Sequence, residues 1–381
     1  MAELTINNKI KTIAFYLPQF HEIEENNQAY GKGFTEWTNT KKAIPLFPNH
    51  YQPRTPYHNN YYDLLDVKVM KEQTDLAQKY GLYGFCFYHY WFTGGKLLLE
   101  KPIENYLNNT EIDFPFCLCW ANENWSKRWD GGNGEVIAKQ DYGDSKDWAS
   151  HMDYLFKFFK DPRYITKNGK PVFIIYRPDL IPNIKKRVDF IRSYAKNNGF
   201  TDICIMAQHP TYFVEKENRD IFDNYIEFEP AYINKQNGYK PYHAIKRGLE
   251  RIILDTFGEK PINYLKAKAK KSKSASLDLH DYDEDWKMII DARIESDKQI
   301  AGAFVDWDNT PRNVNGLAYS NATPEKFGYY FSLLCDKVNT KYKEKIIFIN
   351  AWNEWAEGAY LEPDERYGYA YLEALNCSLK E

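Results

Sequence analysis

The 381-residue sequence predicts an α/β protein of the (β/α)8 barrel type, because it contains eight short apolar runs of strand character and helix-like segments lie between most of them. Near-continuous apolar strands that alternate with helices indicate a parallel sheet covered on both faces. A count of eight favours a closed barrel over an open doubly wound sheet. The predicted strands are 10–17, 83–90, 114–120, 171–176, 203–207, 225–228, 301–305 and 346–351.

The helix-like segments carry recognisable start and stop signals. Segment 66–80 has apolar residues at helical spacing and stops at Gly81, a residue that suits the position after a helix. A later helix begins at Thr323, ahead of Pro324, which is favoured at the first helical position. That helix is predicted over 323–338, and the other predicted helices are 147–159 and 183–198.

One connection is too long for an ordinary link between neighbouring elements of a barrel. Residues 231–299, between the sixth and seventh strands, include the lysine-rich run 266–276. We expect a single domain over 1–381, with 231–299 as an insertion over the barrel mouth. The lysine run is compatible with a nucleic-acid or lipid-headgroup contact, but a solvated loop is the favoured interpretation.

Composition narrows the function classes. Fifty Lys and Arg against 53 Asp and Glu give a net charge of -3, which argues against nucleic acid or an anionic membrane as the main partner. Aromatic residues make up 17% of the chain, and many stand beside amides and carboxylates, as in 120–125. Aromatic rings stack on the C–H faces of sugars while polar neighbours bind the hydroxyls. An oligosaccharide or polysaccharide is therefore the expected partner, with an aromatic-rich core as the alternative explanation.

The sequence also predicts a reduced, cytoplasmic protein. Four of the six cysteines lie in strand-like runs, where a thiol behaves as a small apolar side chain. Residues 1–9 lack the basic and apolar regions of a signal peptide. No apolar run reaches the length of about 18–20 residues that spans a membrane.

Polar or aromatic residues follow the predicted strands, at the barrel face where such folds place their chemistry. The residues selected as candidate site residues are His21, Glu36 and Trp37 after the first strand, Tyr88, Tyr90 and Trp91 after the second, Trp120, Asn122, Glu123 and Trp125 after the third, Arg177 after the fourth, Glu227 after the sixth, Asp306 and Asp308 after the seventh, and Asn353, Glu354 and Glu357 after the eighth. Together they predict a substrate pocket.

Glu354 and Glu357 are the candidate catalytic residues. One helical turn after the last strand would set their carboxyl groups on the same side, and repulsion would separate their pKa values. Glycoside cleavage commonly uses such a pair, one protonated to assist the leaving oxygen. The alternative is a solvated helix start, but the flanking Trp352 and Trp355 are unusual on a surface.

Other chemistries find less support. Asp306-Trp307-Asp308 resembles a DxD metal site for a sugar nucleotide, but no nucleotide-binding half-sheet accompanies it. The histidines form no HxH or HExxH pair, and neither GxSxG nor a phosphate-binding glycine motif is present. For Glu123, a salt bridge to Lys127 or Arg128 is an alternative to a substrate contact. We expect no metal and no cofactor.

Several ordered motifs resemble the WbsX-type proteins of O-antigen and capsule loci, a family similar to family 99 of the glycoside hydrolases. The motifs are 13–21, 33–38, 83–92, 119–125, 306–312 and 346–364, so that the resemblance covers nearly the whole chain. Family 99 enzymes are (β/α)8 endo-acting glycosidases that cleave α-mannosidic links with retention.

The resemblance implies roles for individual residues. Glu354 would be the base on the sugar's own 2-hydroxyl, giving a 1,2-anhydro-sugar intermediate, and Glu357 would be the general acid and then the general base. Asn353, Trp120, Trp125, Tyr88 and Tyr90 would line the sugar subsite. The expected function is a retaining glycoside hydrolase or transglycosylase acting on a bacterial polysaccharide. A glycosyltransferase of lipopolysaccharide or capsule biosynthesis and a catalytically silent glycan-binding barrel are the alternatives.

Overall fold

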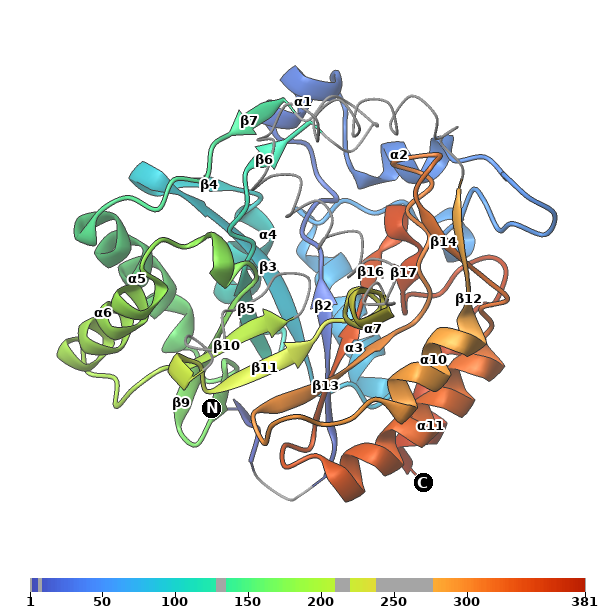
Figure 1. Cartoon of the computed structure of the whole chain (residues 1–381). Helices are drawn as coiled ribbons and strands as arrows, with labels where there is room; N and C mark the ends of the chain where they lie inside the picture. The colour runs from blue at the N-terminus through green and yellow to red at the C-terminus, as the bar shows by residue number, and fades with distance from the viewer. Residues whose placement is uncertain (1, 6–8, 128–134, 210–219, 238–276, 381) are drawn as a thin grey trace, which may run out of the picture.

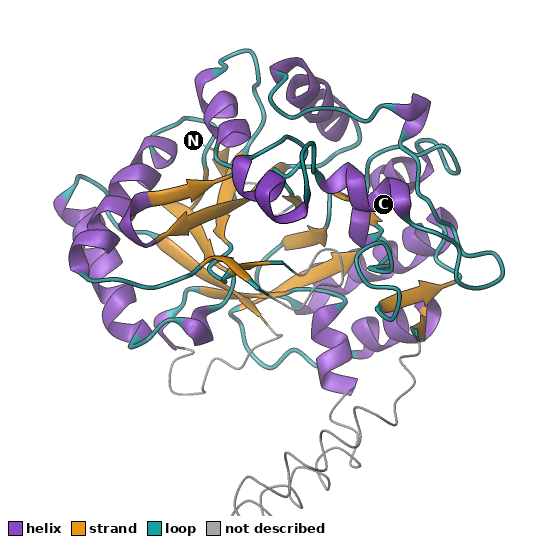
Figure 2. Ribbon diagram, turned by 90° about the horizontal axis from the view of Figure 1, so that it is seen from above, coloured by secondary structure: helices purple, strands orange, loops and turns teal. Residues whose placement is uncertain are grey.

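Eight parallel strands close into a barrel in the computed structural model, which describes residues 2–5, 9–127, 135–209, 220–237 and 277–380. Each strand pairs with the next, and the last pairs with the first through Ile346–Ile349 and Lys11–Ala14. The helices form a ring around the strands (Figure 2). The predicted (β/α)8 fold is confirmed. The barrel strands are β2 (Lys11–Tyr16), β3 (Gly84–Phe92), β5 (Phe116–Trp120), β9 (Lys170–Ile175), β10 (Cys204–His209), β11 (Asn224–Glu227), β13 (Gln299–Phe304) and β15 (Ile346–Asn350).

The four helices predicted from the sequence are present as α3, α5, α6 and α11, with ends shifted by up to three residues. Thr323 caps α11 as expected, accepting a hydrogen bond from the backbone of Lys326 at 3.3 Å. None of the helices in the described part of the chain is long and apolar enough to cross a membrane. The described α-helices are α1 (Glu24–Tyr30), α2 (Glu36–Lys42), α3 (Val67–Lys79), α4 (Lys101–Asn108), α5 (Ser145–Phe159), α6 (Ile184–Asn197), α7 (Ala231–Asn237), α10 (Tyr282–Asp291), α11 (Pro324–Lys341) and α12 (Ala370–Lys380).

Nine short strands in the described residues lie outside the eight barrel strands. Figure 1 shows α1, α2 and the β6–β7 ribbon gathered above one end of the barrel, the end to which the parallel strands point. These elements belong to the connections that leave the carboxyl ends of β2 and β5. The short strands are β1 (Ala2–Glu3), β4 (Lys96–Leu98), β6 (Trp125–Ser126), β7 (Val136–Ala138), β8 (Ile165–Lys167), β12 (Asp278–Asp281), β14 (Leu317–Ser320), β16 (Asn353–Glu354) and β17 (Ala359–Tyr360).

Aromatic side chains fill the barrel and its contacts with the helices. Phe15 lies inside, with its ring centroid 5.5 Å from that of Phe348 and 5.2 Å from that of Phe228. Outside the strands, Trp286 of α10 stacks on Phe304 of β13 at 5.3 Å. Such pairs bury large apolar areas and fix the positions of the strand ends.

The structure describes residues 231–237 and 277–299 of the predicted insertion. Its helix α10 packs against the barrel wall through Trp286, and Tyr282 donates a hydrogen bond to the carbonyl of Val305 at 2.8 Å. Strand β12, just before α10, pairs with β14 beyond the seventh barrel strand. The lysine-rich run 266–276 lies outside the described residues.

Candidate active site

A cleft of about 470 Å³ opens at the carboxyl ends of the barrel strands. It brings together seven residues that were selected from the sequence. They are Tyr88, Tyr90, Glu123, Trp125, Arg177, Glu354 and Glu357. The cleft is also lined by Arg312 and Trp307, to which the sequence analysis assigned no role.

A tight turn aims both candidate carboxylates into this cleft. Instead of the expected α-helical turn, Asn353–Glu354 forms strand β16, paired with β17, and Trp355–Glu357 forms a single 3-10 turn. Gly358 closes the turn with a φ of 65°, a conformation that a residue with a side chain rarely adopts. We call residues 353–358 the glutamate turn.

Asn353 holds the glutamate turn to the barrel. Its side-chain oxygen accepts a hydrogen bond from the backbone N–H of Leu17 at 2.7 Å, and its amide nitrogen donates to the carbonyl of Leu17 at 3.1 Å. The side chain is fully buried and does not line the cleft. The structure therefore gives Asn353 an anchoring position beneath Glu354.

Arg312 is the cation at the centre of the site. Its guanidinium donates hydrogen bonds to Glu357 and to Glu36, and it lies 3.5 Å from the carboxylate of Glu354. Glu36, the first residue of α2, is completely buried. Three carboxyl groups thus converge on one guanidinium, an arrangement in which Arg is favoured because its planar fork can serve several oxygens.

The electrostatics of the site favour a retained proton. Burial raises the pKa of Glu354 well above its usual value, and the neighbouring Glu357 adds to this effect, while Arg312 opposes it. Burial also raises the pKa of Glu357, again against the opposing effect of Arg312. The direct contact with Arg312 favours the ionised form of Glu357. This contact favours placing the retained proton on Glu354.

Aromatic side chains form one wall of the cleft. Tyr88 and Tyr90 project from β3, and the ring of Trp125 meets Tyr90 edge to face at 4.9 Å. The indole of Trp125 donates a hydrogen bond to Asn26 at 3.2 Å, which fixes its orientation. Burial, together with the nearby Glu354, raises the pKa of both tyrosines well above 10, so that both remain neutral phenols.

An ion-pair chain lies at the rim of the cleft. Arg177 donates to Glu123 and, at 2.9 Å for each of two contacts, to Asp179. Among the described residues, the ion-pair partner of Glu123 is Arg177, on the next strand end. The sequence alternative named Lys127 or residue 128, and residue 128 lies outside the described residues.

Three other candidates lie behind the cleft wall. Trp91 stacks on His151 at 4.8 Å, and its carbonyl accepts a hydrogen bond from the indole of Trp120 at 3.1 Å. Asn122 is fully buried and exchanges two hydrogen bonds of 2.7 Å with the backbone of Arg177. These side chains support the wall and do not line the cleft.

His21, Trp37 and Glu227 also lie outside the cleft lining. His21 is 1% exposed, and the indole of Trp37 donates to the carbonyl of Tyr62 at 2.8 Å. The carboxyl group of Glu227 accepts hydrogen bonds of 2.6 Å from both Gln299 and Tyr342. Burial raises its pKa to about 7. Gln299 begins strand β13, so Glu227 is held at the barrel wall by its neighbours.

The two aspartates of the DxD pattern are bound to other protein groups. Asp306 forms an ion pair of 2.7 Å with Arg54. Asp308 contacts His50 and Gln52 at 2.7 Å and accepts a hydrogen bond from the hydroxyl of Thr310 at 2.6 Å. Neither lines the cleft, and no cluster of His, Cys, Asp and Glu suited to a metal ion occurs in the described ranges.

Comparison with known families agrees with the resemblance noted from the motifs. The model of the family described as "Glycosyltransferase WbsX" matches residues 12–375. The chain belongs to the WbsX family. This WbsX-family chain is 37% identical over 374 residues to a protein of Xanthomonas campestris pv. campestris (strain B100) named "Uncharacterized protein WxcX". The match covers 96% of this chain and 49% of the relative, so the chain spans about half the length of the curated relatives it matches.

Solved structures share the fold of this WbsX-family chain. The GH99 endo-alpha-mannosidase from Bacteroides thetaiotaomicron aligns with a TM-score of 0.54 and 11% identity, over 99% of this chain and 98% of the other. A "Glycoside hydrolase-like protein" aligns with a TM-score of 0.59 and 14% identity, over 98% of this chain and 95% of the other. At such low identities the likeness establishes a common fold.

Proposed function

We propose that this WbsX-family chain is a retaining glycoside hydrolase or transglycosylase in which Glu354 and Glu357 are the catalytic carboxylates. The observation that carries the proposal is the presence of both carboxyl groups in one aromatic-walled cleft at the carboxyl ends of the barrel strands. Burial raises the pKa of each, which suits proton transfer near neutral pH. The common fold with the GH99 enzyme supports the same direction.

The proposed reaction has two steps. In the first, Glu354 takes the proton of the sugar's 2-hydroxyl, O2 attacks C1, and the bond from C1 to the leaving oxygen breaks as Glu357 protonates that oxygen. In the second, Glu357 takes a proton from water as the water oxygen attacks C1, the C1–O2 bond of the 1,2-anhydro sugar breaks, and O2 regains its proton from Glu354. Two inversions at C1 give net retention. A transglycosylase would use an acceptor hydroxyl in place of water.

Arg312 adds a requirement to this scheme. Glu357 must hold a proton when it acts as the acid, yet in this structure it is paired with Arg312. Because the guanidinium is also 3.5 Å from Glu354, it is positioned to stabilise an ionised Glu354 once substrate has entered. We propose that substrate binding moves the proton of the pair from Glu354 to Glu357, with Arg312 as the fixed positive charge.

The proposed substrate is a bacterial surface polysaccharide of the O-antigen or lipopolysaccharide type, as the WbsX resemblance implies. A cytoplasmic location is part of the same proposal. It is supported by Cys86, Cys117 and Cys119, which are buried as thiols on two adjacent strands with no disulfide among them.

The family description supports a second candidate, a glycosyltransferase. It predicts that product forms only when a nucleotide-linked or lipid-linked sugar donor is present. A catalytically silent glycan-binding barrel is the third, and it predicts binding without any product.

The test is incubation with oligosaccharides prepared from the surface polysaccharide of the source organism, followed by mass spectrometry and NMR of the products. The proposal predicts shorter oligosaccharides, or transfer products, whose new anomeric centre first appears in the configuration of the cleaved link. An inverted first product would contradict the proposed mechanism. Product formation that depends strictly on an added sugar donor would favour the transferase.

A further inference from the structure

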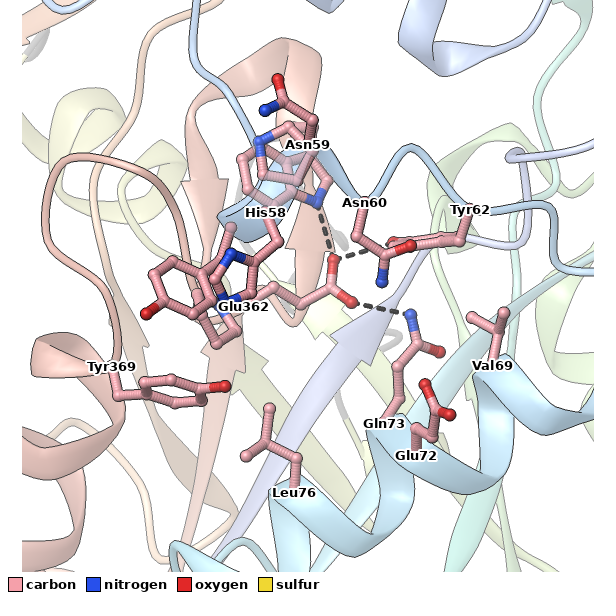
Figure 3. Close-up of a pocket in the computed structure, with 14 residues that line it drawn as sticks. His58, Asn59, Asn60, Tyr62, Val69, Glu72, Gln73, Leu76, Glu362 and Tyr369 are labelled. Carbon is pink, nitrogen blue, oxygen red and sulfur yellow. Dashed lines mark hydrogen bonds between the residues drawn. The ribbon is translucent and has the colours of Figure 1, made fainter.

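A second cavity of about 620 Å³ lies behind the glutamate turn and shares no lining residue with the cleft. Its wall comes from the loop 56–60, from helix α3 and from the segment that follows the glutamate turn. Its volume falls in the range of roughly 300–1,000 Å³ that small-molecule sites occupy. Figure 3 shows Glu362 near its centre, between the loop that carries His58 to Asn60 and the α3 residues Gln73 and Glu72.

Trp355 connects this cavity to the glutamate turn. It lies between Glu354 and Glu357 in the sequence, but its side chain lines the second cavity. Its indole N–H donates to Glu362 at 2.7 Å, and its ring stacks on Tyr360 at 3.8 Å. We call this space the Trp355 cavity. A molecule bound in it would contact the same turn that carries the two catalytic glutamates.

Glu362 lines the Trp355 cavity and is held in place by hydrogen bonds. Its carboxyl group accepts hydrogen bonds from Trp355, from the hydroxyl of Tyr62 at 2.8 Å and from the amide of Gln73 at 2.7 Å. The residue is 7% exposed. A buried carboxyl with three donors holds its neighbours in one arrangement, so the cavity is preformed.

The lining has the composition of a site for a neutral polyhydroxylated ligand. Tyr57 and Tyr369 offer aromatic surface, with ring centroids 5.4 Å apart, and Asn59 and Asn60 are exposed amides that can both donate and accept. No Lys or Arg is among the described residues of this lining, which disfavours phosphate, nucleotides and acidic sugars. A cation is also disfavoured, because the carboxyl of Glu362 is already bound by three protein donors and Glu72 is on the exposed face of α3.

We propose that the Trp355 cavity is a second carbohydrate-binding site, which holds a neutral glycosyl unit separately from the catalytic cleft. The choice of a sugar over another neutral polyol rests on the proposed function. A polysaccharide held at both places gains effective concentration at the cleft. Loss of the second site should therefore raise KM for a long polysaccharide by about tenfold, leave kcat nearly unchanged, and have little effect on a short oligosaccharide.

The direct test is a binding titration with neutral methyl glycosides (methyl α-mannoside, methyl α-glucoside and methyl N-acetyl-β-glucosaminide). Binding is followed by tryptophan fluorescence and by saturation-transfer NMR. Leu76→Trp fills the cavity and Tyr369→Ala removes one aromatic wall, whereas Tyr329→Ala is a matched control because Tyr329 is 63% exposed on α11. We expect saturable binding of at least one glycoside to the wild type and to the control, weakened at least tenfold in both cavity variants.

Three results would overturn the proposal: no saturable binding of any glycoside, binding that Leu76→Trp and Tyr369→Ala leave unchanged, or displacement of the sugar by choline chloride or inorganic phosphate. Circular dichroism is used to check that each variant is folded before its binding is measured. The titration is repeated in Glu354→Gln, where no turnover takes place if the proposed function is right. If the catalytic proposal fails, the wild type shows no turnover, but the binding titration still gives its result. Failure of the catalytic proposal can therefore be told apart from failure of the binding proposal.

Discussion

The guanidinium of Arg312 donates a hydrogen bond to the carboxylate of Glu357 and so ties the loop after the seventh barrel strand to the glutamate turn after the eighth. The same guanidinium binds the buried Glu36 and lies 3.5 Å from Glu354. One positive charge thus serves three carboxyl groups. This balance sets how tightly the two candidate catalytic groups hold a proton.

Replacing Arg312 with Met should move the pH profile of kcat/KM to higher pH. Arg312 lowers the pKa of both Glu354 and Glu357, so its removal raises both, by about 1–3 pH units for a lost charge at this range. The acidic limb reports the base, which must lose its proton, and the alkaline limb reports the acid, which must keep one. Both limbs should move to higher pH. The measurement is kcat/KM from pH 4 to 9.

Arg312→Lys is the matched control, because it keeps the charge and loses the planar fork. It should shift the limbs less than Arg312→Met. A profile in Arg312→Met that coincides with that of the wild type, in a protein shown to be folded, would contradict the role given to Arg312. Folding must be checked, since leaving Glu36 buried and unpaired costs about 3–5 kcal/mol.

Glu36→Gln should shift the same profile in the opposite direction. The ionised Glu36 raises the pKa of both Glu354 and Glu357, and its neutral replacement also frees Arg312 to pair more fully with them. Both limbs should therefore move to lower pH. An upward shift, or none, would show that Glu36 does not act on the pair through charge.

Chelation should leave activity unchanged. Asp306 is bound by Arg54, and Asp308 is bound by His50, Gln52 and Thr310. The oxygens of these carboxylates are therefore already used in contacts with other protein groups. Dialysis against EDTA, followed by assay with and without added Mg²⁺ or Mn²⁺, measures this. Loss of activity that Mn²⁺ restores would support the transferase alternative with a DxD metal site.

The stability of the protein should fall between about pH 4.5 and 7 because of Glu362. Burial raises the pKa of this group from 4.5 to about 7. Below pH 4.5 both folded and unfolded states are protonated, and as the pH rises the unfolded state ionises first. The free energy of unfolding should therefore drop by roughly 3 kcal/mol, at about 1.4 kcal/mol per pH unit, and the loss is complete once the pH passes 7.

Denaturant unfolding of the wild type and of Glu362→Gln across this pH range isolates the effect. The variant keeps one accepting oxygen at every pH and does not titrate, so that its stability should fall less with pH. Parallel curves for the two proteins would refute the shifted pKa of Glu362. Glu227 titrates in both proteins and cancels in the difference.

The barrel was predictable because seven of its eight strands contain an uninterrupted apolar run of at least four residues, as a parallel strand buried on both faces requires, with β11 as the exception. The positions of side chains at the strand ends were only partly predictable. Tyr88 and Tyr90 face the cleft, whereas Trp91 packs on His151 behind it. Successive residues of a strand alternate between its two faces, and this signal was available in the sequence.

Other site features depend on contacts between distant parts of the chain. Arg312 lies in a loop and contacts Glu36, 276 positions earlier, so neither spacing nor periodicity links them. Asn122 and Asn353 have the residue type of sugar-binding groups, but buried backbone atoms of Arg177 and Leu17 take their hydrogen bonds. Such buried backbone groups need partners, and which side chain supplies them is decided by the closed barrel.

The central claim, that Glu354 and Glu357 carry the reaction, is tested most directly by the turnover of Glu354→Gln and Glu357→Gln on an oligosaccharide that the wild type cleaves. Each variant should lose about 100- to 10,000-fold in kcat, as expected for loss of a general acid or base, while still binding the oligosaccharide. Glu325→Gln, on an exposed first turn of α11, should match the wild type. Wild-type turnover in either cleft variant would contradict the account.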